Sequence, residues 1–164
     1  MMILKVFGDD VLYLRTEAEV LAHLDTIFAP GRQAGSWLTQ DFQIVSGETE
    51  DTDNVLGVGL DYDSGYGGLV WYCQGRVAEQ AALAQGTEVA EYVWVSKNPD
   101  PLETDPMVMY DPGSPTFFNR ISAIPFGDAR LAIMEFFREG TGFRPAHAQW
   151  VKGHCTGELY EEED

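Results

Sequence analysis

The chain is poor in basic residues. Its 164 residues include 10 lysines and arginines against 27 aspartates and glutamates, which gives a formal net charge of −17. Nucleic-acid binding needs clustered lysine and arginine side chains that neutralise phosphates, so this charge disfavours direct binding to DNA or RNA. The same sign of charge disfavours an anionic membrane surface. A basic protein partner, by contrast, would be attracted by it.

Long apolar runs are missing as well. The apolar run in the N-terminal segment MMILKVFGDD is too short for a signal peptide. No stretch approaches the roughly 18 consecutive apolar residues that a membrane-spanning helix needs. We therefore expect a cytoplasmic protein. Cys73 and Cys155 are the only cysteines and show no CxxC spacing. Two cysteines in a cytoplasmic domain are more often buried apolar side chains than a disulfide.

Patterns that carry catalysis or bind metals are scarce. The three histidines, His23, His147 and His154, have no GxSxG or cysteine-protease context, and the spacing HxxxxxxHC near the end matches no zinc motif. The repeated glycines GVG and GYGG lack the sequence patterns of phosphate-binding loops, so turns and β-bulges are the better interpretation of them. We therefore expect neither an enzyme nor a cofactor or metal site.

Two segments carry the signals of helices. In the first, Thr16-x-x-Glu19 forms a capping box, in which the hydroxyl and the carboxylate each satisfy an unpaired backbone N–H group. Apolar residues follow at helical spacing, and Pro30-Gly31 closes the segment.

The second helix lies within the stretch from Ile121 to Trp150. Pro125 ends an extended run and suits the first turn of a helix, whereas Gly140 supplies a left-handed stop. Between them runs one apolar stripe at helical period, which marks a face of the core. The stripe comprises Ala129, Ile133, Phe136 and Phe137.

The rest of the chain is dominated by strand patterns. The segment 76–86 fits either a short helix or strand and loop. We expect an α+β fold with a largely antiparallel β-sheet of about six to eight strands and two main helices packed on one face. The length favours a single domain over residues 1–164, with a flexible acidic tail at 158–164. The strand candidates are Ile3–Phe7, Val11–Leu14, Phe42–Val45, two strands within Val55–Cys73, Glu91–Val95, Met107–Tyr110, Ile121–Ile124 and Ala146–Trp150.

Acidic and aromatic residues gather in the central turns. Between residues 41 and 63 there are seven acids and no lysine or arginine. A run such as GETEDTDN is most often a solvated loop, and it lacks the glycine and distal glutamate of a calcium-binding EF-hand. Aromatic rings amid carboxylates are also typical of protein interfaces, with rings as anchors and charges for steering. We therefore expect a partner to bind at Glu48, Glu50, Asp51, Asp53, Asp61, Asp63, Tyr66, Tyr110 and Asp111.

The run from IPF through the second helix to RPxxxxW resembles a known family. It is similar to the C-terminal half of the Imm1 family of immunity proteins, which bacteria make to neutralise their own polymorphic toxins. Nearly all the matching residues are apolar, glycine or proline, so they mark a fold more than a chemistry. They are Ile124, Pro125, Phe126, Ala129, Ala132, Glu135, Phe136, Phe137, Gly140, Arg144, Pro145 and Trp150, with a looser match at Gly67, Gly68 and Trp71.

The resemblance implies a partner. Such proteins usually sit beside toxins, often deaminase-fold enzymes that act on nucleic acid, and inhibit them by one-to-one binding. An enzyme of this kind needs a basic substrate channel, to which an acidic protein is matched. The alternative is a small acidic hydrolase using a carboxylate pair near Asp61, Asp63 and Asp111. A third possibility is a scaffold without any inhibitory role.

Overall fold

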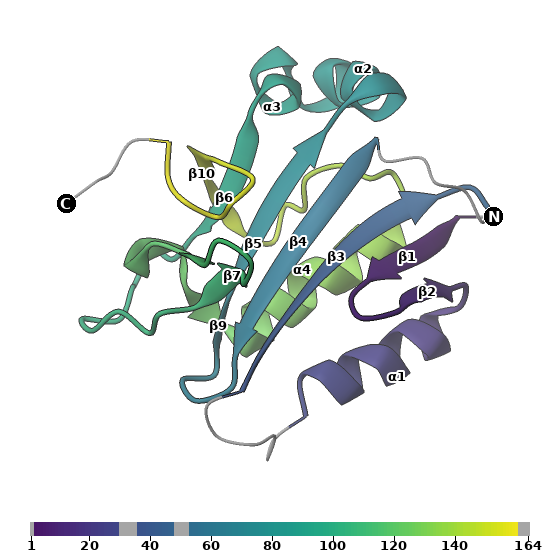
Figure 1. The fold of residues 1–164 in the computed structure, drawn as a ribbon. Coiled ribbons are helices and arrows are strands. Elements are labelled where there is room, and N and C mark those ends of the chain that lie inside the picture. The colour runs from purple at the N-terminus through teal and green to yellow at the C-terminus, as the bar shows by residue number, and fades with distance from the viewer. Residues whose placement is uncertain (1, 30–35, 48–52, 161–164) are drawn as a thin grey trace.

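The computed structural model describes residues 2–29, 36–47 and 53–160, which form an eight-stranded antiparallel sheet with helices packed against it (Figure 1). The strand order is β10-β6-β5-β4-β3-β1-β2, and β9 adds to β5. The predicted α+β class is therefore confirmed. The strands are β1 (Ile3–Phe7), β2 (Val11–Leu14), β3 (Trp37–Val45), β4 (Asn54–Asp61), β5 (Tyr66–Cys73), β6 (Val93–Lys97), β9 (Ile124–Pro125) and β10 (Gln149–Gly153).

The two expected helices are α1 (Glu17–Ile27) and α4 (Phe126–Glu139). Two further helices, α2 (Gly75–Gln85) and α3 (Thr87–Glu91), follow β5, so the segment 76–86 is helical as far as Gln85. Within the described part of the chain, none of these helices has the length and apolar character needed to cross a membrane. A separate hairpin of β7 (Met109–Asp111) and β8 (Thr116–Phe117) completes the fold.

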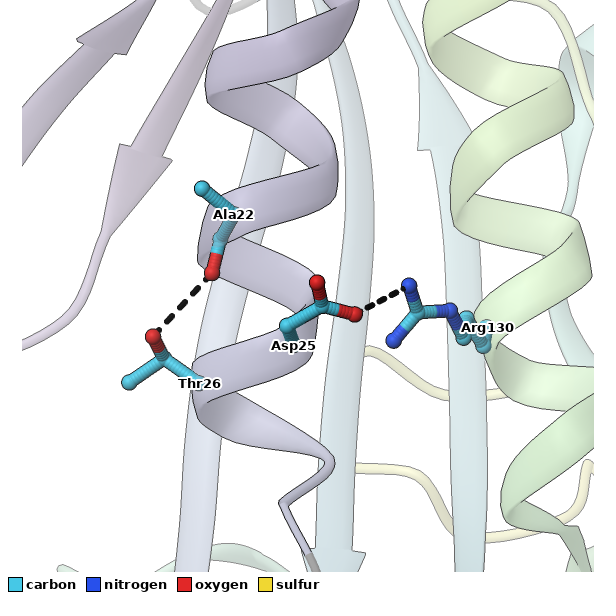
Figure 2. A network of polar contacts seen from close by, with 4 residues as sticks. All are labelled: Ala22, Asp25, Thr26 and Arg130. Carbon is cyan, nitrogen blue, oxygen red and sulfur yellow. Dashed lines mark hydrogen bonds and ion pairs between the residues drawn. The ribbon is translucent and has the colours of Figure 1, made fainter.

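The main core lies between the sheet and the helices α1 and α4. Successive residues of a strand point to opposite faces, so each central strand gives this core every second side chain. From α4, Phe136 is buried as the apolar stripe predicts, whereas Phe137 is only partly buried. At the surface, Arg130 Nη2 lies 2.7 Å from Asp25 Oδ1 and ties α4 to α1 (Figure 2). These two helices therefore cover one face of the sheet.

The start of α1 shows the predicted capping. Thr16 Oγ1 accepts the N–H of Glu19 at 3.1 Å, and the Glu19 carboxylate accepts the N–H of Arg15 at 2.7 Å. The second contact therefore reaches one residue further back than the usual capping box, in which the N-cap residue itself donates. The expected closing pair Pro30-Gly31 lies outside the described residues.

The ends of α4 also follow from the sequence. Pro125 is the N-cap residue, and the helix begins at Phe126. Gly140 has a φ of 63° and donates its N–H to the Phe136 carbonyl at 3.2 Å. Since this left-handed conformation is costly for residues with a side chain, the glycine stop is confirmed.

The segments that flank α4 depart from the prediction. The strand expected over residues 146–150 begins only at Gln149, because the Glu135 carboxylate accepts the N–H groups of Ala146 and His147 before they can join the sheet. The extended run expected at 121–124 is instead a 3-10 helix over Arg120–Ser122, followed by β9, because the Asn119 side chain accepts the N–H of Ile121 at 3.0 Å.

Other strand boundaries shift by a few residues. The strands expected at 91–95 and 107–110 begin two residues late, because Glu91 ends α3 and Met107 has a left-handed φ of 57°. β3 begins five residues earlier than the apolar segment Phe42–Val45, at Trp37.

Four of the GVG and GYGG glycines lie inside strands, namely Gly57, Gly59, Gly67 and Gly68, so the interpretation as turns and bulges is wrong for them. Gly65 lies in the β4–β5 turn with a φ of 74°, as the turn interpretation predicts. β4 and β5 pair in unbroken register from Asn54 opposite Cys73 to Asp61 opposite Tyr66. A Cβ atom on Gly57 would overlap the Tyr110 hydroxyl, and one on Gly68 would overlap the Phe118 ring. These glycines therefore form a bare strip of sheet on which the β7–β8 hairpin rests.

A second core lies under this hairpin, on the sheet face opposite α1 and α4. It comprises Val70, Val95, Val108, Phe118, Ala123 and Leu159. Leu159 forms an isolated bridge with Gly153, and the N–H of Tyr160 donates to the Lys152 carbonyl at 3.0 Å. The first three residues of the expected acidic tail thus lie against β10, and residues 161–164 are outside the described part of the chain.

Candidate partner-binding site

The hairpin covers only part of its sheet face, and a depression of about 700 Å³ lies beside it. We call this depression the Asp41 groove. The β1–β2 turn borders it on one side and the start of the β7–β8 turn on the other. It is lined by Phe7, Gly8, Asp9, Trp37, Leu38, Thr39, Gln40, Asp41, Tyr72, Tyr110, Asp111, Pro112 and Cys155.

A pair of half-buried side chains marks the boundary between the covered and open parts of the face. Asp41 on β3 lies opposite Gly57 on β4, and Tyr110 from the hairpin reaches across that glycine. The Tyr110 hydroxyl donates to Asp41 Oδ1 at 2.8 Å. Burial raises the pKa of the Asp41 carboxyl, although the hydrogen bond from Tyr110 acts in the opposite direction. Burial, together with the nearby Asp41 charge, also raises the pKa of Tyr110.

The charges that line the groove have one sign. Asp9, Asp41 and Asp111 are acidic, and none of the described lining residues is a lysine or arginine. The nearest cation along β1 is Lys5, which is buried with its Nζ 4.5 Å from the centroid of the Phe7 ring. The groove therefore presents a negative potential to any partner.

The open end of the groove has an exposed aromatic ring. Trp37 is 44% exposed and lies opposite Asp61 on β4. Here β3 extends beyond β1, whose pairing stops at Phe7 opposite Asp41. Within the described residues, the main chain of 37–40 has a strand partner only on the β4 side.

The structure brings some of the predicted site residues to this groove. Tyr110 and Asp111 line it directly. Asp61 lies at its Trp37 end, where Asp61 Oδ2 accepts the N–H of Ser64 at 3.0 Å and shapes the β4–β5 turn. Asp63 is exposed in that turn, and Tyr66 packs against the second core.

The remaining predicted residues are not part of the groove. Asp53 precedes β4, whose eight residues at about 3.3 Å each separate it from the β4–β5 turn by about 25 Å. Glu48, Glu50 and Asp51 lie outside the described residues. The expected contact of a partner with all nine residues stays a prediction.

Sequence reasoning did not single out Asp9, Trp37 and Asp41 as a group. Successive side chains of the segment WLTQDFQIV point to alternate faces of the sheet, and Leu38, Phe42 and Ile44 face the main core. Extending this period of two to the polar first half of β3 would have placed Trp37 and Asp41 on the opposite face.

Titratable groups elsewhere have structural roles. His23 Nε2 lies 2.8 Å from Gln40 Oε1, and His147 Nε2 lies 3.2 Å from Asp128 Oδ1. Burial, with a smaller effect of the Asp53 charge, raises the pKa of the Cys73 thiol to about 11, so this thiol stays protonated at neutral pH. Within the described residues, no three His, Cys, Asp or Glu side chains gather as metal ligands would.

The residues of the family resemblance support the fold. Besides Glu135, which holds the loop after α4, Arg144 stacks with its guanidinium carbon 4.5 Å from the centroid of the Trp94 ring. Trp150 Nε1 donates to the Pro145 carbonyl at 2.8 Å. These side chains fix the path from α4 to β10, and none of them lines the Asp41 groove.

The described fold is an α+β sheet with an acidic open groove beside its hairpin. The model of the family described as immunity protein Imm1 matches residues 8–152. The chain therefore belongs to the Imm1 family of immunity proteins, and the resemblance seen in the sequence is confirmed. Neither the curated proteins nor the solved structures contain a match. Family membership supports a role in immunity to a toxin.

Proposed function

We propose that this protein inhibits a cognate toxin of deaminase fold by binding it one-to-one and covering its nucleic-acid-binding active site. The observation that carries the proposal is the Asp41 groove, an acidic and aromatic-rimmed depression on a protein that belongs to an immunity family. In this proposal the protein acts by occupying a surface and catalyses no reaction.

Charge supports this choice of partner. An enzyme that acts on nucleic acid binds phosphates through lysine and arginine side chains, and a base must enter its pocket. A protein with a net charge of −17 is attracted to such a channel over a long range. The groove then supplies a local match, because three carboxylates line it without a lysine or arginine among the described lining residues.

Co-expression tests the proposal. The toxin domain encoded beside this gene should arrest growth when expressed alone and should be tolerated when this protein is present. The purified pair should have the mass of a one-to-one complex, and deamination of single-stranded nucleic acid by the toxin should stop at equimolar inhibitor. Normal binding with undiminished toxin activity would contradict active-site covering, and absence of both binding and rescue would contradict the immunity role.

A further inference from the structure

Among the described residues, the Asp41 carboxylate has a hydrogen-bond donor at only one of its two oxygens. Oδ1 accepts the Tyr110 hydroxyl at 2.8 Å, whereas no described residue donates to Oδ2. The side chain is half-buried, and no described lysine, arginine or histidine forms an ion pair with it. A partly desolvated carboxylate gains more from a cation than an exposed one does, because water screens the pair less.

The side chains around Asp41 suit a basic ligand. Asp9 and Asp111 add negative charge from the two sides of the groove, and Tyr72 lies on its floor. Trp37 is exposed at the open end, where its ring can cover the apolar stem or the charged head of a long basic side chain. Lys5 is buried, with its Nζ 4.5 Å from the centroid of the Phe7 ring, and it makes no hydrogen bond or ion pair to Asp41.

The main chain offers a second point of attachment. Since β1 stops pairing at Asp41, the edge of β3 over residues 37–40 is free of a strand partner among the described residues. Extended peptides bind such edges through main-chain hydrogen bonds, while alternate side chains enter neighbouring pockets. A peptide on this edge would run directly alongside the groove.

We propose that an extended basic segment of the toxin lies along this edge of β3 and places one arginine or lysine side chain in the Asp41 groove, paired with Asp41 Oδ2. This assignment rests on the proposed function, since it names where and through which chemistry the toxin is held. The groove thus occupies a cation that the toxin uses for nucleic-acid phosphates.

Binding kinetics with the purified toxin domain test the proposal. Asp41→Asn keeps the shape of the side chain and the acceptor for Tyr110 but removes the charge. Removing one partner of a desolvated charge pair should weaken binding by about 30-fold or more, mainly through faster dissociation. Trp37→Ala should weaken it by about tenfold. Glu79→Gln, an exposed acid on α2 away from the groove, is the matched control and should change affinity less than about twofold.

A double-mutant cycle identifies the toxin residue. Asp41→Asn is combined in turn with alanine variants of each surface arginine and lysine of the toxin, and one of them should couple to it by at least about tenfold. Hydrogen exchange should show slower exchange at one or more amides of 37–40 in the complex. If the parent protein binds but Asp41→Asn and Trp37→Ala bind equally well, the groove assignment is wrong and the immunity role stands. If the parent itself does not bind the toxin, both proposals fail.

Discussion

Asp41 and Tyr110 are 69 residues apart in the sequence and meet through a 2.8 Å hydrogen bond at the edge of the covered part of the sheet. The contact exists because Gly57 leaves room for the tyrosine ring to pass over β4. It joins the hairpin to the sheet at a residue that lines the Asp41 groove.

The first prediction concerns stability and pH. Burial raises the pKa of Asp41 in the folded protein above its ordinary value of 3.8. A raised carboxyl pKa means that its contribution to stability is fully present below the unfolded pKa and is lost as the pH rises through the folded pKa. The Asp41→Asn variant should therefore melt at the same or a higher temperature than the parent at pH 7. The difference between the two melting temperatures should become smaller as the pH falls towards 4. Thermal melts in which the variant is clearly less stable at pH 7 would contradict this.

The second prediction concerns the glycine strip. Gly57→Ala introduces a methyl group where the Tyr110 hydroxyl lies, and such overpacking costs about 1–3 kcal/mol or more. Tyr110→Phe removes that hydroxyl and its hydrogen bond to Asp41. The double variant should be more stable than the sum of the two single losses implies, because the phenylalanine relieves part of the overlap. Denaturant unfolding of all four proteins measures this coupling, and strict additivity would mean that the two sites do not touch.

The third prediction separates two neighbouring phenylalanines of α4. Phe136 is 1% exposed, so Phe136→Ala should lower the unfolding free energy by about 3–5 kcal/mol. Phe137 is only partly buried, and Phe137→Ala should lower it by less. Equal losses in denaturant titrations would show that the face of the helix is assigned wrongly.

The fourth prediction concerns association with the toxin. Asp9 and Asp63 are exposed on the β1–β2 and β4–β5 turns. Reversing both charges to lysine should slow association about tenfold at low salt and flatten its salt dependence, because exposed charges act on the encounter. Glu79→Lys with Glu139→Lys changes the net charge equally on other surfaces. Stopped-flow measurements at two salt concentrations should show the larger effect for the first pair, and equal effects would mean that only total charge matters.

The fifth prediction concerns the residues that a catalytic function would need. Replacing His23, His147, His154, Cys73 or Cys155 one at a time should leave toxin neutralisation intact in every variant that folds. A folded variant that binds the toxin yet fails to protect the cell would point to chemistry at the replaced side chain. Growth assays combined with binding measurements distinguish a variant that no longer binds the toxin from one that binds it without protecting the cell.

The elements predicted correctly from the sequence are those with local signals. The Thr16 cap contacts Glu19 and the Gly140 stop contacts Phe136, so each contact joins residues only a few positions apart and spacing alone identifies it. Boundaries were missed where a distant side chain takes the backbone hydrogen bonds, as Glu135 does at Ala146.

The groove depends on contacts that a linear pattern does not contain. The approach of Tyr110 to Gly57 joins segments that are separated by two strands and two helices. The sequence therefore predicted Tyr110 and Asp111 as site residues from composition, whereas the alternation of β3 alone does not place Asp41 beside Tyr110.

The bare glycine strip also determines how rigid the groove is. At Gly59 the Met109 carbonyl lies directly against the main chain of β4, and the Tyr110 and Phe118 side chains lie directly against the main chain at Gly57 and Gly68. The wall that carries Tyr110 and Asp111 is therefore held at a fixed height above the floor that carries Asp41. A partner that enters such a preorganised groove has little to order on this side of the interface, so more of its contact energy remains as affinity.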